Sequence, residues 1–225
     1  MSFTGFDHAA VDLLDALPSW SPEQFAARRR QLNDGLRWPG GELLTELASR
    51  LDADLTVESR RSVSPLHRDR RFAPAGSARY KDHLLLTTWE GADTSTSPTL
   101  WIRIDAHRVG FASGLGFTPV LRERWRTAVG GRSGASLATE LNQLAGRHRA
   151  EVAGEKIKTV PAPFTANHPR AELLRLNSFQ VRFTDELPET ITTPHFASWC
   201  AERFEELLTV HRWLLADVTT PQPKG

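Results

Sequence analysis

The stretch TLWIRIDAHRVGFASGLGF, residues 99–117, indicates the fold class of this chain. It contains two runs of residues typical of strands, separated by a polar turn over residues 105–108. This pattern predicts a β-hairpin, and therefore an antiparallel pair of strands. Gly110, Gly114 and Gly116 weaken the second run, so we expect a bulge or a close backbone approach there.

Further strands are expected on both sides of the hairpin. LTVESRRSV, residues 55–63, and YKDHLLLTTWEG, residues 80–91, precede it, and FQVRF, residues 179–183, follows it. The middle of the second segment is apolar on both faces, which is typical of a central strand. The sequence therefore predicts a sheet with several strands.

Helical patterns dominate the N-terminal part. A short amphipathic helix is expected to end at Pro18, and the next helix to begin at Ser21 as N-cap, with Pro22 at the first helical position and Gln24 completing a capping box. The run Trp38 to Gly41, which contains Pro39, interrupts this second pattern before it resumes. We expect two helices or one kinked helix there.

The C-terminal half adds further helices. Residues 119–129, 136–148 and 169–176 show helical patterns, and residues 194–216 place aromatic and aliphatic side chains on one stripe, typical of a buried closing helix. We expect one α+β domain over residues 1–218, with a mostly antiparallel sheet flanked by N-terminal helices and the long C-terminal helix. A flexible tail over residues 219–225 would follow it, as is common at chain termini.

Composition limits the classes of function. Of the 225 residues, 28 are basic and 27 acidic, so contact with nucleic acid or an anionic membrane would need a local patch, and a nucleic-acid partner is not favoured. Cys200 is the sole cysteine, which excludes an internal disulfide. No segment has the roughly 20 consecutive apolar residues of a membrane span. We expect a cytoplasmic protein; the sequence gives no oligomeric state.

Positive charge is concentrated in RDRRFAPAGSARYKDH, residues 68–83. Arginine offers a planar fork of donors to phosphate and carboxylate, lysine adds a compact charge, and histidine can shuttle a proton. In an extended strand Lys81 and His83 would point to the same face, with Arg68 and Arg71 reaching in from the preceding loop. The hypothesis is a cationic cleft for a phosphorylated or carboxylate-bearing small molecule, with His83 as the candidate proton donor.

Arg71 is the expected anchor of the anion. It directly precedes Phe72, whose ring could fix the backbone and so reduce the entropy lost on binding. An arginine fork held in this way would recognise an oxyanion better than a mobile lysine.

Two alternatives stay open for the same segment. The cations could pair with Asp69, Asp82 and other acids in a structural network, or stand in solvent. They could also form the surface of an interaction module for RNA or an acidic protein, which would place exposed aromatics between spread cations. Trp89 and Trp101 are the strand aromatics to inspect for that role, although their spacing suits core packing.

The chain resembles the conserved hypothetical family called domain of unknown function 2461. The resemblance rests on SVSPLHRDRRFAPAGSARYKDH, on WIRIDAHRVGFASGLG and on TVPAPFTANHPRAELLRL. It implies a frame of Arg-Asp-x-Arg-Phe followed by Tyr-Lys-x-His. The matching residues are Arg68, Asp69, Arg71, Phe72, Tyr80, Lys81 and His83. The resemblance covers nearly the whole chain and implies no established reaction.

Other features depart from the family pattern. The chain has SWSPEQF where the family carries an asparagine-rich turn and Glu-Trp-Phe, and the neutral run APAGSA in place of a loop lysine. A later Pro-Arg-Gly or Pro-Lys-Gly element is replaced by Pro161, Ala162 and Pro163. The resemblance therefore implies a divergent member, with an altered ligand preference or without activity.

The remaining candidates favour no other chemistry. His168 resembles part of a family Asp-His-Pro element but is better explained as a helix cap, and Cys200 as a core residue. The histidines lack metal-ligand spacing, so no metal site is expected. Neither a phosphate-binding loop nor a dinucleotide glycine fingerprint is present, so we expect no cofactor. Ser113 and Ser133 lack a nucleophile-elbow sequence.

Overall fold

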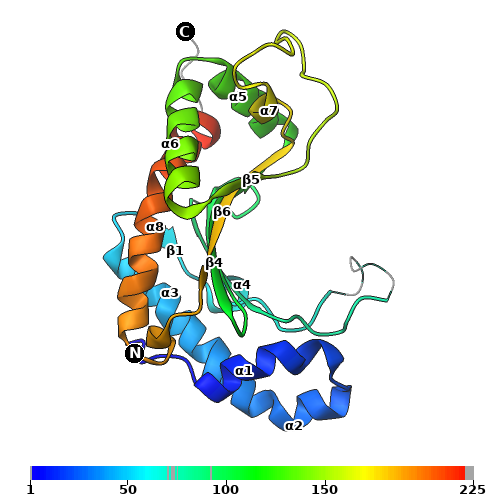
Figure 1. Cartoon of the computed structure of the whole chain (residues 1–225), viewed down its shortest axis with the longest axis vertical. Coiled ribbons are helices and arrows are strands. Elements are labelled where there is room, and N and C mark those ends of the chain that lie inside the picture. Colours follow the sequence, from blue (N-terminus) through cyan, green and yellow to red (C-terminus); the bar gives the residue numbers. More distant parts are fainter. Residues whose placement is uncertain (1, 70, 72–73, 75, 92, 221–225) are drawn as a thin grey trace. The chain divides into compact units, whose positions relative to one another are not determined.

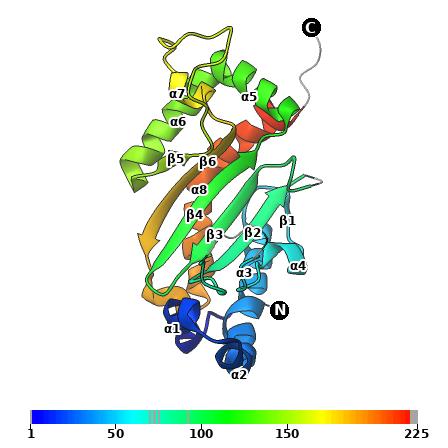
Figure 2. The same ribbon diagram turned by 90° about the vertical axis from the view of Figure 1, so that its right-hand side faces the viewer.

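The computed structural model describes residues 2–69, 71, 74, 76–91 and 93–220 of the chain. It contains a six-stranded sheet in the order β1-β2-β3-β4-β6-β5 together with several helices (Figures 1 and 2). The strands are β1 Leu55–Thr56, β2 Leu84–Glu90, β3 Thr99–Ile104, β4 Arg108–Gly116, β5 Glu151–Ala153 and β6 Ser178–Glu186. The predicted α+β class with an antiparallel sheet is confirmed.

The N-terminal helical elements are α1 His8–Ala16, η1 Leu17–Ser19, α2 Pro22–Leu32, η2 Asn33–Arg37, α3 Trp38–Arg50 and α4 Ser59–Ser62. Those that follow the hairpin are α5 Pro119–Gly130, α6 Ser133–His148, α7 Ala171–Leu174, η3 Glu189–Thr192, α8 His195–Trp213 and η4 Leu214–Thr219. Of the tail predicted at residues 219–225, Thr219 ends η4, and residues 221–225 lie outside the described residues.

The chain divides into two compact units. Unit 1 comprises Met1–Thr88, Trp101–Gly110 and Asp185–Arg203. Unit 2 comprises Trp89–Leu100, Phe111–Thr184 and Phe204–Gly225. Each unit is described by itself below, and the single domain expected over residues 1–218 stays a prediction.

An aromatic cluster lies in the core of unit 1. The ring centroid of Phe6 lies 5.3 Å from that of Phe3 and 5.9 Å from that of Phe196, and all three side chains are buried. Phe196 stands near the start of α8, the helix predicted from the apolar stripe. The burial of such large rings is a main source of stability.

Unit 2 has its own aromatic core. The buried ring of Trp125 lies 4.8 Å from Phe179 and 5.8 Å from Trp213, centroid to centroid. The Trp125 indole N–H donates to the carbonyl of Leu173 over 2.9 Å, so the polar atom of this buried ring is satisfied. Cys200, in the part of α8 that belongs to unit 1, is buried, as predicted.

The hairpin prediction is confirmed. β3 and β4 flank a turn in which the Asp105 carboxylate accepts the N–H groups of His107 and Arg108, at 3.0 and 2.9 Å. Gly114 provides the expected close backbone approach, because a Cβ there would lie 2.8 Å from the carbonyl oxygen of Phe179. A side chain at this position would therefore strain the β4–β6 pair.

The helix predicted to begin at Ser21 does so, with the complete capping box. Its backbone continues through the π turn η2 into α3, so the interruption predicted near Trp38 is a change of helical pitch. The Trp38 N–H donates to the carbonyl of Asn33, five residues back. Pro39 lacks an N–H and its ring clashes with a preceding carbonyl, which explains the wider turn just before it.

Two strand predictions are wrong in their bounds. Only Leu55–Thr56 of the segment 55–63 forms a strand, and Ser59–Ser62 forms the short helix α4. The Ser62 hydroxyl accepts the Glu58 N–H at 2.9 Å, a local bond that competes with strand pairing. The strand predicted from Tyr80 begins only at Leu84, because Asp82 and His83 form a bend. The short strand β5 was not predicted.

Candidate functional site

The cationic segment is held against a neighbouring strand-like segment in unit 1. His67 pairs with Tyr80, and Val63 pairs with Leu86, both antiparallel. Between these bridges lie three residues on one side (64–66) and five on the other (81–85). The two extra residues form a bulge that contains Lys81 and His83, and bulges are a common means of re-aiming side chains near functional sites.

Tyr80 anchors the backbone beside this bulge. Its ring is 2% exposed and stacks on that of Phe25 from α2, with centroids 4.4 Å apart and planes at 2°. Tyr80 thus provides the aromatic ring that fixes the backbone, a role predicted for Phe72, which lies outside the described residues. The hydrogen bond from the Lys81 N–H to the Leu66 carbonyl, 2.8 Å long, fixes the next residue.

Lys81 is a half-buried cation beside a second cation. Its ammonium group donates to the Ser64 hydroxyl over 2.6 Å. Burial, and then the charge of Arg68, lower the pKa of Lys81. Within the described residues no carboxylate pairs with either cation, and the Arg68 Nε is buried without a hydrogen-bond partner. Two cations are thus brought together without a compensating acid.

His83 belongs to a network next to Lys81. Its Nδ1 lies 2.6 Å from Oδ1 of Asp82, and the same oxygen lies 3.3 Å from a guanidinium nitrogen of Arg103 on β3. Arg103 also pairs with Asp105 at 2.9 Å. Burial acts to raise the pKa of Asp82, but the hydrogen bond and charge of His83 and the charge of Arg103 together lower it.

The tautomer of His83 follows from this contact. An ionised Asp82 can only accept, so Nδ1 of His83 carries the proton and Nε2 presents a lone pair. Burial lowers the pKa of His83, and the charges of Arg103 and Lys81 act in the same direction. At neutral pH His83 is therefore a neutral proton acceptor at Nε2, and it becomes a donor there only when it is protonated.

Arg71 has a different environment. Its side chain is 81% exposed, and its guanidinium group donates to both oxygens of Asp69, at 3.0 and 2.7 Å. The hydrogen bonds from Arg71 lower the pKa of Asp69 to about 2. The structure thus brings Arg68 and His83 each within electrostatic reach of Lys81, while the fork of Arg71 is occupied by its neighbour two residues away.

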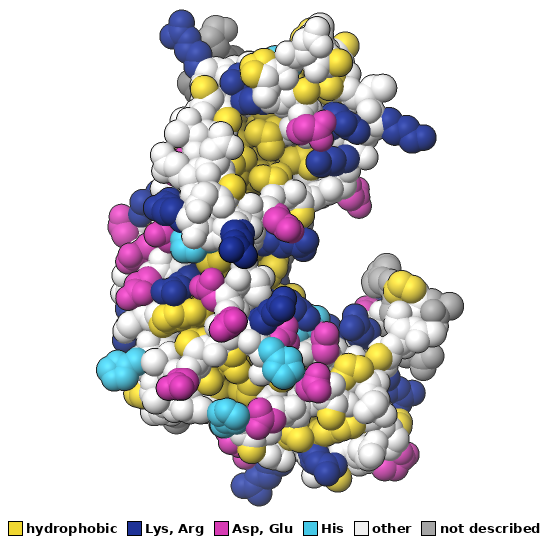
Figure 3. Space-filling view, viewed as in Figure 1, with side chains coloured by type: hydrophobic (Ala, Val, Ile, Leu, Met, Phe, Trp, Pro, Cys, Tyr) yellow, Lys and Arg dark blue, Asp and Glu magenta, His cyan; other side chains and the backbone are white. Residues whose placement is uncertain are grey.

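Ser64 and Arg103 were not predicted as parts of the site. Ser64 lies 17 residues before Lys81 in the chain, and Arg103 belongs to the hairpin. No local pattern signals either role, because each depends on the pairing of distant segments. Figure 3 shows basic and acidic side chains interspersed on the face it draws, in keeping with a net charge of +1. The excess of positive charge around Lys81 is therefore local to that site.

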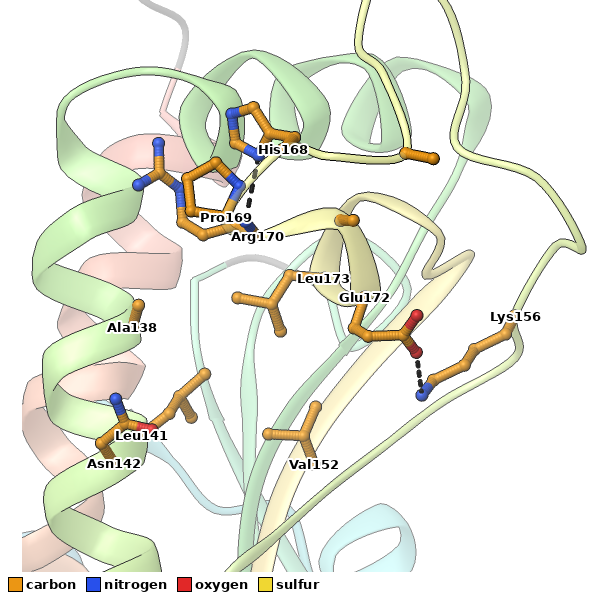
Figure 4. A pocket seen from close by; sticks show the side chains of 12 residues that line it. Ala138, Leu141, Asn142, Val152, Lys156, His168, Pro169, Arg170, Glu172 and Leu173 are labelled. Atoms are coloured by element: carbon orange, nitrogen blue, oxygen red, sulfur yellow. Dashed lines mark hydrogen bonds and ion pairs between the residues drawn. The ribbon is translucent and has the colours of Figure 1, made fainter.

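Unit 2 contains a pocket of about 620 Å³ beside α6 and α7. Figure 4 shows its apolar side chains, among them Leu141, Val152 and Leu173, with the Lys156–Glu172 ion pair at one side. That pair measures 3.2 Å. The pocket is mostly apolar, which is typical of sites for small molecules.

The other basic residues of this pocket are also engaged. Arg170 donates to the carbonyls of Val129, Gly130 and Gly131, at 2.6 to 3.2 Å, and thereby caps the C-terminal end of α5. His168 accepts the Arg170 N–H through Nδ1. The capping role predicted for His168 is wrong, because the N-cap of α7 is Arg170 and this cap has no side-chain hydrogen bond. The pocket therefore offers less to an anion than the Arg68–Lys81 pair does.

Two further features bear on function, namely the grouping of possible metal ligands and the length of the apolar helices. Among the residues that the structure describes, no group of three or more His, Cys, Asp or Glu side chains could hold a metal ion. No helix within those residues has the length and apolar character needed to cross a membrane.

The fold and the site define a class of protein, an α+β chain with one antiparallel sheet and a half-buried cation pair in the segment before β2. The chain belongs to the family described as conserved hypothetical protein (DUF2461), which matches residues 21–213. The resemblance seen in the sequence is thereby confirmed, and the match includes the whole Arg68 to His83 segment. None of the curated proteins matches the chain.

Proposed function

We propose that this protein binds a small molecule bearing a phosphate or carboxylate group, through Lys81, Arg68 and His83. The observation that supports it is the half-buried Lys81 ammonium, which has the Arg68 charge beside it and a hydroxyl as its hydrogen-bond partner. Like charges in a partly desolvated place destabilise the empty site, and such arrangements are concentrated at functional sites. A bound anion would compensate both cations.

The three residues would have different tasks. Lys81 supplies a point charge oriented by Ser64. Arg68, whose Nε has no hydrogen-bond partner among the described residues, offers its guanidinium group to an oxyanion. His83, held by Asp82, would accept a proton from the ligand at Nε2 or, once protonated, donate to it. Arg71 would join only a ligand that competes with Asp69, so the proposal does not need it. The cytoplasmic location expected from the sequence stays part of this proposal.

A thermal-shift screen with phosphorylated metabolites, nucleotides and carboxylic acids tests the proposal. A ligand that binds the folded state raises the melting temperature, and the stabilisation grows with the logarithm of the ligand concentration over Kd. We expect a response that Lys81→Gln and Arg68→Gln each abolish. Lys158→Gln is the matched control, because Lys158 is exposed in unit 2 and no ion pair involves it within the described part of the chain. A panel without any response, or a response that survives Lys81→Gln, would overturn the proposal.

A further inference from the structure

Trp38 is unusual because its large apolar side chain is 67% exposed. Among the described residues only Val120 shares this property with it. Trp38 begins α3 directly after the π turn η2, where the hydrogen bond from its N–H to Asn33 fixes the backbone. The indole is thus displayed on a rigid helical segment, and π turns inside helices are frequent at functional sites.

The Trp38 side chain lines two separate hollows. One, of about 520 Å³, is lined by Trp38 together with Arg29 and Arg30 of α2. The other, of about 860 Å³, is lined by Trp38 together with Arg37 and Thr45. The exposed indole therefore borders two hollows, and at least one arginine also lines each of them.

Further positive charge gathers near the same segment. Burial, and then the charges of Arg29, Arg79 and Arg37, lower the pKa of His67. These three arginines come from α2, from the cationic loop and from η2, so the fold has brought them together. The Arg37 Nε is buried and has no hydrogen-bond partner among the residues that the structure describes. We call Arg29, Arg37, Trp38, His67 and Arg79 the Trp38 surface.

Acidic side chains near this surface compensate it only in part. Asp34 pairs with Arg30 at 3.4 Å, and Glu42 lines the same hollow as Trp38 and Arg37. The hydrogen bond from the Ser21 hydroxyl is the main cause of the lowered pKa of Glu23, and the charge of Arg79 is the smallest. In the part of the chain that the structure describes, no ion pair holds Arg29, Arg37 or Arg79. The surface therefore keeps a net positive charge.

A second pairing of an arginine with an indole occurs at α2. The Arg28 guanidinium lies over the ring of Trp20, 5.1 Å from its centroid. Only Leu32 of the eleven residues of α2 is buried, so the outer side of this helix is available for contact. Arginines thus accompany an indole both at Trp20 and at Trp38, whereas a site for a small anion would have cations converging on one enclosed volume.

We propose that the Trp38 surface binds single-stranded nucleic acid, with a base stacked on the Trp38 indole and phosphates held by Arg29 and Arg37. Stacking on aromatic side chains between backbone-tracking cations is the general mode of binding single strands without sequence preference. The carboxylates of an acidic protein would satisfy the arginines but would not stack on the exposed indole, whereas every nucleotide carries both a phosphate and a flat base. This inference concerns a different surface from the Lys81 site and does not depend on it.

Fluorescence anisotropy with a short labelled oligouridylate tests the proposal. We expect binding at low salt, weakened about tenfold by Trp38→Ala, since stacking of a base contributes on that scale. Arg29→Gln and Arg37→Gln should each reduce the slope of log K against log salt by about 0.7, the value for one phosphate contact on a single strand. Trp38 is largely exposed, so Trp38→Ala should leave the melting temperature unchanged.

Three controls make the result specific. Arg132→Gln removes an exposed arginine of unit 2 and should change neither affinity nor salt slope. Lys81→Gln should leave oligonucleotide binding intact, which separates this surface from the Lys81 site. Polyglutamate of matched charge should compete weakly. Equal binding of polyglutamate that is insensitive to Trp38→Ala would favour an acidic protein partner and overturn the proposal, as would the absence of any oligonucleotide binding.

Discussion

Nδ1 of His83 lies 2.6 Å from Oδ1 of Asp82, so the imidazole is oriented by the carboxylate of the preceding residue. Arg103 holds the same oxygen from the hairpin at 3.3 Å, which limits the freedom of the Asp82 side chain. Because the Asp82 carboxylate can only accept a hydrogen bond, Nδ1 of His83 carries the proton and Nε2 presents a lone pair. An anion beside Nε2 is repelled by this lone pair and attracted by an imidazolium, so binding and protonation of His83 should be coupled.

The coupling predicts the pH dependence of anion binding. The pKa of His83 is lowered from its ordinary value of 6.5, chiefly by burial, and a bound anion would raise it. Affinity should therefore increase as pH falls from about 7 to about 5, by at most about tenfold per pH unit for one proton. Sulfate is a suitable probe because its own charge is constant over this range. Isothermal titration calorimetry measures the affinity.

His83→Asn is the control for that experiment. The asparagine amide can still donate to Asp82 but cannot titrate. The variant should bind sulfate with little pH dependence. A slope that persists in His83→Asn would assign the proton to another group and remove His83 from the site.

Arg71→Lys tests whether Arg71 anchors the ligand, as the sequence analysis predicted. Because the guanidinium group donates to both carboxylate oxygens of Asp69 and the side chain is 81% exposed, we expect the ligand response of this variant to equal that of the unmodified protein. The melting temperature should also change little, since exposed ion pairs contribute about 0–1 kcal/mol. Loss of ligand affinity by roughly 1–3 kcal/mol would restore Arg71 as the anchor.

His211 should make the stability of the protein depend on pH. It is fully buried in unit 2, where its Nδ1 lies 3.3 Å from the Ser113 hydroxyl and its Nε2 lies 3.6 Å from a carboxylate oxygen of Glu90. Burial, and then the charge of Arg212, lower the pKa of His211 to about 4. The unfolded chain binds the proton more readily, so stability should fall as pH drops from about 6.5 to about 4, by about 3 kcal/mol.

Urea denaturation at several pH values measures this effect. His211→Gln should flatten the curve in the acidic range, even if the variant is less stable at neutral pH, because it removes the titrating group. An unchanged acid dependence in that variant would contradict the role given to His211. Carboxylates such as Asp69, whose pKa is lowered to about 2, affect stability mainly below this range.

Two glycine substitutions test the packing of β4 against β6. Gly114→Ala would place its Cβ 2.8 Å from the Phe179 carbonyl oxygen, so we expect a loss of about 1–3 kcal/mol in the free energy of unfolding. Gly146→Ala in α6 meets no described atom within 4 Å and should stabilise the helix by roughly 0.5–1 kcal/mol. Chemical denaturation measures both. Equal effects of the two changes would contradict the close approach at Gly114.

The sequence by itself determined the elements whose causes are local. The capping box at Ser21 and Gln24, the hairpin around Asp105 and the buried stripe of α8 each follow from residues within a few positions of one another. The antiparallel α+β class follows from these elements. The family frame from Arg68 to His83 was also visible in the sequence.

Only the tertiary structure decided which cations have partners. Arg71 finds Asp69 two residues away, whereas Lys81 meets Ser64 and Arg68 across a bulged pair of segments that no local pattern indicates. The arginines around His67 likewise come from separate elements. A sequence pattern shows which charges are present, but burial and the pairing of distant segments set the free energy of each charge, and these depend on the folded chain as a whole.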